Sequence, residues 1–181
     1  MLVNLPGLER DPQWTADAAQ AAVAAGADML EIQEVHSPGH RLVIERLRAM
    51  TSRVDVPCLL WVDRPYLHRF VIDQRAEYRL VPECIAAGAA GMVAPVPTAH
   101  IETFALACGD DLAPIAFVSP QAGPAHLEQA SRHNRGFLYA IGLKTSPPAD
   151  PQVARRLAAF ARVARERSGL PVITGAGVAT P

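Results

Sequence analysis

Short, almost continuously apolar runs alternate with helical stretches along the whole chain, and this alternation limits the folds open to it. Apolar runs without a regular polar alternation are typical of parallel strands that are buried on both faces. Successive strand–helix–strand units join such strands through right-handed crossovers. The sequence therefore predicts an α/β protein with a parallel sheet. The expected strands are Leu2–Pro6, Met29–Gln33, Cys58–Val62, Gly91–Pro95, Pro114–Ser119, Phe137–Gly142 and Pro171–Thr174.

The segments between these runs have the lengths and end signals of helices. The longest one contains Pro82, so we expect a break there. Thr98 is expected to cap one helix, and Asp150, which is followed by a proline, is expected to cap the last. The expected helices are Thr15–Ala25, His40–Ser52, Pro65–Ala87, Thr98–Cys108, Pro124–His133 and Asp150–Arg167.

A proline precedes every second strand at a constant interval. Pro57, Pro114 and Pro171 follow one another at 57 residues, and a helix-ending glycine such as Gly26 or Gly88 precedes strands between them. A two-unit period of this kind is expected of a (β/α)8 TIM-type barrel, in which odd and even strands supply alternate core layers. A doubly wound open sheet is the alternative, but it gives no reason for the period.

The length of 181 residues predicts a single domain over residues 1–181. Complete barrels typically need about 250 residues, with about 200 near the lower limit. We therefore expect an incomplete barrel with seven visible strands, lacking the last strand and helix. Open strand edges invite pairing with other chains, so a homo-oligomer or a further C-terminal segment is expected.

Composition and net charge exclude some classes of binding partner. The chain is 50% hydrophobic and has a net charge of −1 without a basic stripe, so neither nucleic acid nor an anionic membrane is expected. No apolar run reaches the roughly 18 residues of a membrane span. The three cysteines are widely spaced in apolar surroundings, as in reduced, packed thiols of a cytoplasmic protein.

Carboxylates at the ends of two strands are the first candidates for chemistry, because barrel enzymes act at the C-terminal ends of their strands. Glu31 lies inside an apolar strand, where loss of water raises a carboxyl pKa toward acid–base use. The alternative is an ion pair with an arginine of a neighbouring strand. Glu34 and Asp63 are candidates for a second acid or base; alternatively, Glu34 is a solvated loop residue and Asp63 pairs with Arg64.

Four further residues lie within or after the later strands. Tyr139, within the sixth expected strand, is a candidate for contact with a substrate; alternatively, it is itself a core residue. Gly175 and Gly177 form a glycine-rich turn of the type that binds phosphate through backbone N–H groups. Lys144, the only lysine, is either a substrate-binding or Schiff-base group or an exposed loop cation. Only His36 and His40 have a metal-ligand spacing, and the Ser37–Gly39 segment between them is not helical, so no metal is expected. No cofactor is expected either.

Five segments in the same order resemble the tryptophan synthase α subunit family. They are Ala25–Ile32 (AGADMLEI), Gly91–Pro97 (GMVAPVP), Ala113–Pro120 (APIAFVSP), Arg135–Tyr139 (RGFLY) and Pro171–Val178 (PVITGAGV). Members of that family are (β/α)8 barrels that cleave indole-3-glycerol phosphate to indole and glyceraldehyde 3-phosphate by a retro-aldol reaction. They dock on a pyridoxal-phosphate β subunit.

The resemblance implies roles for individual residues. Glu31 matches the family's catalytic glutamate, Tyr139 its tyrosine near the substrate, and Gly177 a phosphate-binding glycine. The implied function is therefore a lyase acting on a phosphorylated small molecule, with a β-like subunit as candidate partner. Two alternatives stay open: an aldolase or isomerase for another carbonyl substrate, and a catalytically degenerate α-like binding subunit.

Three departures from the family pattern accompany the resemblance. The loop after the second strand, which carries the family's second catalytic carboxylate and much of the β-subunit contact, is reduced to Val35–His40. Lys144–Pro148 replaces the phosphate loop after the sixth strand, and Pro95 stands where the family has an aspartate. Glu34 or Asp63 would have to replace the missing carboxylate.

Overall fold

The computed structural model describes residues 1–5, 11–34, 40–63, 67, 80–142 and 151–175. All seven expected strands are present, with ends that differ from the expectation by no more than one residue. They are β1 (Leu2–Leu5), β2 (Met29–Glu34), β3 (Cys58–Val62), β4 (Gly91–Ala94), β5 (Ala113–Val118), β6 (Leu138–Ile141) and β7 (Val172–Gly175).

The helices also follow the expected order. They are α1 (Pro12–Ala24), α2 (His40–Thr51), α4 (Leu80–Ala86), the short 3₁₀ helix η2 (Thr98–His100), α5 (Ile101–Cys108), α6 (Gly123–His133) and α7 (Pro151–Ser168). The start of α1 shows why one of them forms where it does. Asp11 caps it by accepting a hydrogen bond from the backbone N–H of Trp14, and Pro12 fills the first helical position.

One expectation about helix signals is wrong and another stays a prediction. Pro82 lies in the first turn of α4, where its missing N–H removes no helical hydrogen bond. Since the residues just before Leu80 are not described, the expected helix break near Pro82 stays a prediction. Thr98 does not cap α5: it is the first residue of η2, and its hydroxyl contacts the ring of His126 instead. Apart from Leu67, the part of the expected helix that precedes Leu80 lies outside the described residues, as does the expected cap Asp150.

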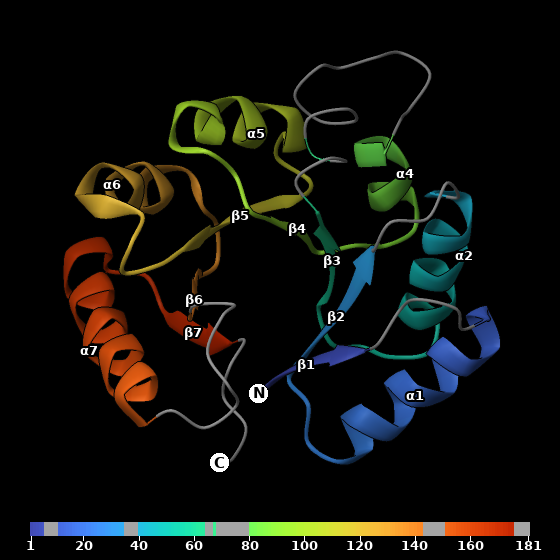
Figure 1. The fold of residues 1–181 in the computed structure, drawn as a ribbon. Helices are drawn as coiled ribbons and strands as arrows, with labels where there is room; N and C mark the ends of the chain where they lie inside the picture. Colours follow the sequence, from blue (N-terminus) through green and yellow to red (C-terminus); the bar gives the residue numbers. More distant parts are fainter. Residues whose placement is uncertain (6–10, 35–39, 64–66, 68–79, 143–150, 176–181) are drawn as a thin grey trace. The chain divides into compact units, whose positions relative to one another are not determined.

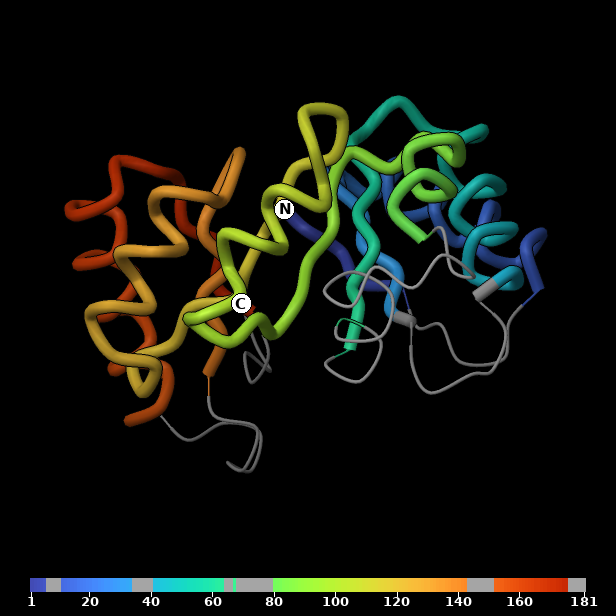
Figure 2. Tube along the Cα trace, turned by 90° about the horizontal axis from the view of Figure 1, so that it is seen from above, coloured from blue at the N-terminus to red at the C-terminus, as the bar shows by residue number. Residues whose placement is uncertain are grey.

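The chain divides into two compact units, each with its own run of parallel strands. The first comprises Met1–Pro95 with Leu106–Ala113, and the second comprises Val96–Ala105 with Pro114–Pro181. In the first unit β1 to β4 pair in chain order, and in the second β5 to β7 do the same. Within each unit the helices lie along one side of the strands (Figure 1, Figure 2).

Strand order that follows chain order, with a helix after each of β1 to β6, is the topology of a (β/α) TIM-type barrel. A doubly wound sheet would reverse its strand order at a switch point, and the described strands show no reversal. The expected fold class is thereby confirmed.

The two faces of the first unit's strands differ. Parallel neighbours in register point their side chains to the same face. On one face Leu30, Ile32, Leu60 and Met92 have no exposed surface. The alternate residues of β2 and β3 belong to the other face, and these include Glu31. The candidate chemistry therefore lies on the face opposite the aliphatic one.

Candidate active site

A row of residues in register crosses the four strands of the first unit. Asn4 pairs with Glu31, Glu31 with Leu59, and Leu59 with Gly91. A Cβ atom on Gly91 would lie 2.9 Å from the backbone oxygen of Ala113 and 3.1 Å from Cδ2 of Leu59. The fourth position of the row therefore admits only glycine.

Glu31 is fully buried in this row, at 0% exposure. Its Oε1 accepts a hydrogen bond from Nδ2 of Asn4 at 2.5 Å. Its Oε2 is also enclosed and has no hydrogen-bond partner among the described residues. The observed partner is a neutral amide, not the arginine that the ion-pair alternative required.

Burial raises the pKa of Glu31 to about 7, and the hydrogen bond from Asn4 acts in the opposite direction. Loss of water disfavours the charged carboxylate, whereas an N–H donor favours it. A carboxyl group with a pKa near neutrality can both give and take a proton at physiological pH. Glu31 thus has the environment of a general acid or base.

The other two carboxylate candidates follow the same pair of strands. Asp63 comes directly after β3 and is half-buried; its backbone oxygen accepts a hydrogen bond from the N–H of Leu67 at 2.9 Å. Glu34 is the last residue of β2, in register with Val62, and its side chain lies outside the described part of the chain. Arg64, the alternative partner of Asp63, also lies outside it.

Tyr139 of the second unit lies on a strand face lined by aromatic rings. It is 6% exposed, and its ring meets Phe117 edge-on with the ring centroids 5.0 Å apart. A Cβ atom on Gly175 would lie 2.7 Å from the Tyr139 hydroxyl oxygen and 2.6 Å from Cε2. The tyrosine ring therefore requires a glycine at position 175.

Two of the predicted site residues, Lys144 and Gly177, lie outside the described residues. Within the described part of the chain, no group of three His, Cys, Asp or Glu residues could hold a metal ion. Cys58, Cys84 and Cys108 are buried free thiols, and burial raises the pKa of Cys58 to about 11. No described helix has the length and apolarity to cross a membrane.

Sequence reasoning missed two buried polar groups of the second unit. The Nε2 of His126 lies 2.7 Å from the backbone oxygen of Phe117, and its Nδ1 lies 2.9 Å from the Thr98 hydroxyl. Since a carbonyl oxygen can only accept, Nε2 carries the proton and donates it to Phe117. In the neutral ring Nδ1 then accepts from Thr98. Asn134 both accepts from the N–H and donates to the oxygen of Ala116, each at 2.9 Å.

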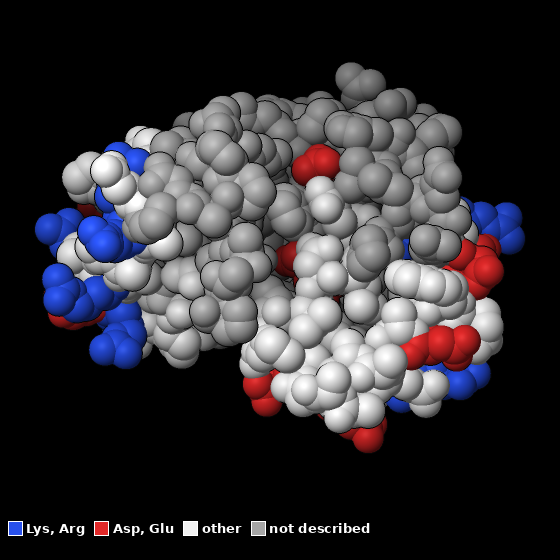
Figure 3. Space-filling model, turned by 60° about the horizontal axis from the view of Figure 1, so that its bottom comes forward, with Lys and Arg blue, Asp and Glu red and all other residues white. Residues whose placement is uncertain are grey.

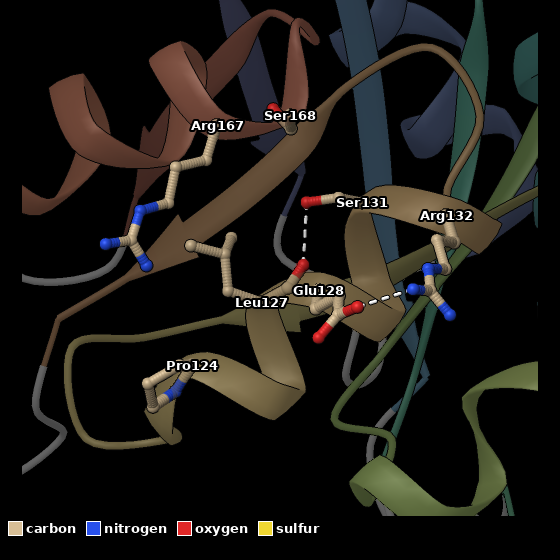
Figure 4. A pocket seen from close by; sticks show the side chains of 7 residues that line it. All are labelled: Pro124, Leu127, Glu128, Ser131, Arg132, Arg167 and Ser168. Carbon is tan, nitrogen blue, oxygen red and sulfur yellow. Dashed lines mark hydrogen bonds and ion pairs between the residues drawn. The ribbon is translucent and has the colours of Figure 1, made fainter.

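A pocket of about 460 Å³ lies between α6 and α7, and none of the predicted site residues lines it (Figure 4). Arg167 extends toward Leu127 across it, while Glu128 pairs with Arg132 along α6. Basic side chains gather at the left of Figure 3, the side on which α7 lies in Figure 1. The exposed arginines of α7 are Arg155, Arg156, Arg162, Arg165 and Arg167.

The fold and the buried carboxyl group define a TIM-type (β/α) barrel protein with a candidate acid–base group on its second strand. The family model for the tryptophan synthase alpha chain matches residues 36–181. The chain therefore belongs to the tryptophan synthase alpha chain family.

The relatives agree with this assignment, and the solved structures agree with the fold. The tryptophan synthase alpha chain of Chloroflexus aggregans is 30% identical over 142 residues, which cover 76% of this chain and 50% of the relative. The chain thus spans about half the length of that protein. The Legionella pneumophila alpha subunit superimposes with a TM-score of 0.76 at 18% identity, covering 99% of this chain and 73% of its own. The alpha subunit in the Pyrococcus furiosus α2β2 complex gives 0.79 at 16% identity, covering 99% and 79%.

Proposed function

We propose that this chain is a lyase of tryptophan biosynthesis that cleaves indole-3-glycerol phosphate to indole and glyceraldehyde 3-phosphate, with Glu31 as its acid–base group. Family membership supports the choice of reaction, and the environment of Glu31 supports the choice of residue. The observation that carries the proposal is a fully buried carboxyl group with one amide partner and one oxygen without a partner.

The reaction needs an acid and a base. A base removes the proton of the glycerol hydroxyl, and the carbon–carbon bond breaks as that carbon becomes the aldehyde. The electrons of the broken bond go to C3 of the indole, which takes the proton from Glu31. Asp63, which directly follows β3, or Glu34 at the end of β2 supplies the base in this proposal.

The second unit provides the remaining proposed roles. Tyr139 contacts the substrate, while the backbone N–H groups at Gly175 and Gly177, with Lys144, bind its phosphate. The aromatic neighbours of Tyr139 support the first role, because aromatic rings pack favourably against another aromatic ring in edge-on and tilted arrangements such as theirs.

Indole release from indole-3-glycerol phosphate by the purified chain tests the proposal. Glu31→Gln keeps the size and the hydrogen-bonding capacity of the side chain but removes its proton exchange. Loss of a positioned acid–base group commonly lowers the rate by about 10² to 10⁴-fold. Glu102→Gln, an exposed change in the first turn of α5, serves as the matched control and should leave the rate unchanged. Absence of indole release from the unaltered chain would reject the lyase assignment.

A β-like subunit is the proposed protein partner, because the Pyrococcus furiosus neighbour is part of a tryptophan synthase α2β2 complex. The proposed location is the cytoplasm, and self-association is the proposed state in the absence of a partner. Sedimentation of the chain alone and with a tryptophan synthase β subunit tests both associations. A lone monomer in both runs would contradict them.

A binding subunit without catalysis is the second candidate, favoured by one observation. Only five residues separate β2 from α2, where the family resemblance leads us to expect a loop with a second catalytic carboxylate. This candidate predicts a stable complex with a β subunit and no indole release. The two functions are thus distinguished by the same two measurements.

A further inference from the structure

We propose that Asn4 is the positioning residue of Glu31: its amide group holds Oε1 and thereby directs the transferable proton to Oε2. This inference rests on the proposed lyase function for its catalytic meaning. Its physical content, the control of one carboxyl group by one amide, concerns the chain itself.

The contact follows from the register of the sheet. Asn4 and Glu31 are partners on the adjacent parallel strands β1 and β2, so their side chains leave the same face at the same level. At 2.5 Å, the Nδ2–Oε1 distance is at the short end for a hydrogen bond and below the usual range for N–H donors to oxygen. Asn4 as a residue is exposed whereas Glu31 is fully buried, so the hydrogen bond joins an exposed residue of β1 to a buried carboxyl group of β2.

The chemistry of the two groups fixes where the proton lies. The NH₂ group of asparagine can only donate, so Oε1 must offer a lone pair. In the acid form of a carboxyl group the carbonyl oxygen is the better acceptor, so the hydroxyl is on the other oxygen. That oxygen is Oε2, which has no hydrogen-bond partner among the described residues. The proton therefore lies on the oxygen that nothing in the described structure holds.

The same bond assists the transfer. When the Oε2–H bond breaks and the proton joins C3 of the indole, a negative charge appears on the carboxylate. Asn4 already donates to that carboxylate, and a hydrogen bond to a charged group is stronger than one to a neutral group. Asn4 thus stabilises the form of Glu31 that the transfer leaves behind, and solvent returns a proton before the next turnover.

The test is a pH titration of Glu31. The titration is monitored by carbon NMR on protein that is labelled at the glutamate carboxyl carbons. Glu31→Gln identifies the signal by removing it. Asn4→Ala removes the donor, and Asn4→Asp keeps the shape while replacing the donor by acceptor oxygens. Gln33→Ala is the matched control, since it removes an amide from the same face of β2, two residues from Glu31.

We expect Asn4→Ala to raise the pKa of Glu31 by about one unit, a tenfold increase in proton affinity. Asn4→Asp should raise it further, because two neighbouring carboxyl groups oppose each other's ionisation. Gln33→Ala should leave it in place. A Glu31 titration that is the same in both Asn4 variants as in the unaltered chain overturns the proposal, and so does an equal shift in Gln33→Ala.

The pH profile of indole release connects the inference to catalysis. If Glu31 donates the proton, the rate falls as the pH rises through its pKa. In Asn4→Ala this fall should move to higher pH by the amount that NMR gives, whereas a merely structural change would lower the rate at every pH. If the unaltered chain releases no indole but Asn4→Ala still shifts the titration, the lyase function fails and the control of Glu31 by Asn4 stands.

Discussion

Buried polar side chains with a partner for every polar atom contrast with one that lacks a partner for one of its oxygens. In the second unit His126 and Asn134 each use both of their polar side-chain atoms in hydrogen bonds, and both join α6 or its end to the backbone of β5. In the first unit the carboxyl group of Glu31 uses one oxygen, on a neutral amide, and leaves the other without a hydrogen-bond partner among the described residues.

This difference separates architecture from chemistry. Buried polar groups in proteins are almost always hydrogen-bonded, so an exception calls for an explanation. The paired groups of the second unit fix a helix against a strand, and each of their polar side-chain atoms has a partner. Glu31 has one oxygen without a hydrogen-bond partner among the described residues, and such an oxygen is available for a hydrogen bond or a proton transfer with a substrate.

The largest expected effect on stability comes from removing the hydrogen bonds of a fully paired side chain in the second unit. Asn134→Ala leaves the N–H and the oxygen of Ala116 without their side-chain partner inside the protein. Each buried group left without a partner costs about 1 to 3 kcal/mol, so for the two groups we expect a total loss of about 2 to 6 kcal/mol. Urea unfolding measures it. Gln20→Ala, at an exposed amide of α1, should change stability little, and a similar loss there would contradict the argument.

Glu31→Gln should increase the free energy of unfolding, in contrast to Asn134→Ala, and the size of the increase should depend on pH. Because its folded pKa is raised from 4.5 to about 7, the stability that the acid form contributes is complete below the unfolded pKa. That stability is lost as the pH rises through about 7. Glutamine avoids the loss, so the variant should gain up to about 3 kcal/mol at pH 8 and nothing near pH 4. Urea unfolding at both pH values measures the gain, and an equal effect at both would refute the raised pKa.

A third experiment probes the aromatic face of the second unit. A methyl group at Gly175 would overlap the Tyr139 ring, so Gly175→Ala should destabilise the protein by about 2 kcal/mol. Thermal unfolding gives the value. In a Tyr139→Leu background the cost should fall, since the smaller side chain leaves room for the methyl group. Costs that simply add would show that the two positions do not touch.

The smallest expected effect concerns the outer partner of His126. Thr98→Val removes one hydroxyl from Nδ1 but leaves the bond from Nε2 to Phe117 intact. The loss of one hydrogen bond should lower the unfolding free energy by about 1 kcal/mol. Thr174→Val, at an exposed position of β7, is the control and should have no measurable effect. A larger loss than that of Asn134→Ala would reverse the order proposed here.

Much of the fold and one site residue could be predicted from local sequence. Continuous apolar runs predicted all seven strands to within a residue at each end, because strand burial is written in consecutive residues. Glu31 was predictable for the same reason: a carboxylate inside such a run is an anomaly that local inspection detects. Thr98 was misread as a helix cap because a threonine hydroxyl has several possible partners, and here it contacts the ring of His126.

The partners of these residues could not be predicted, since they depend on register between strands. Asn4 lies 27 residues before Glu31, and only the pairing of β1 with β2 brings them together. His126 and Asn134 look like ordinary helix residues until β5 is placed against them. The glycine at position 175 was interpreted as a phosphate-binding residue; the structure shows a steric reason for it, and the phosphate role stays a prediction.

The prolines at the starts of three strands also favour the observed register between neighbouring strands. The backbone oxygens of Pro57, Pro114 and Pro171 accept hydrogen bonds from Leu30, Arg135 and Leu138, respectively. A proline has no N–H to give in return, so a neighbouring strand that slid past it would forfeit a bond. A slip of one residue would also turn every side chain to the opposite face. Each proline thus disfavours a shifted register of the strand that bonds to it, and Pro57 in this way helps to hold β3 in register with β2, the strand that carries Glu31.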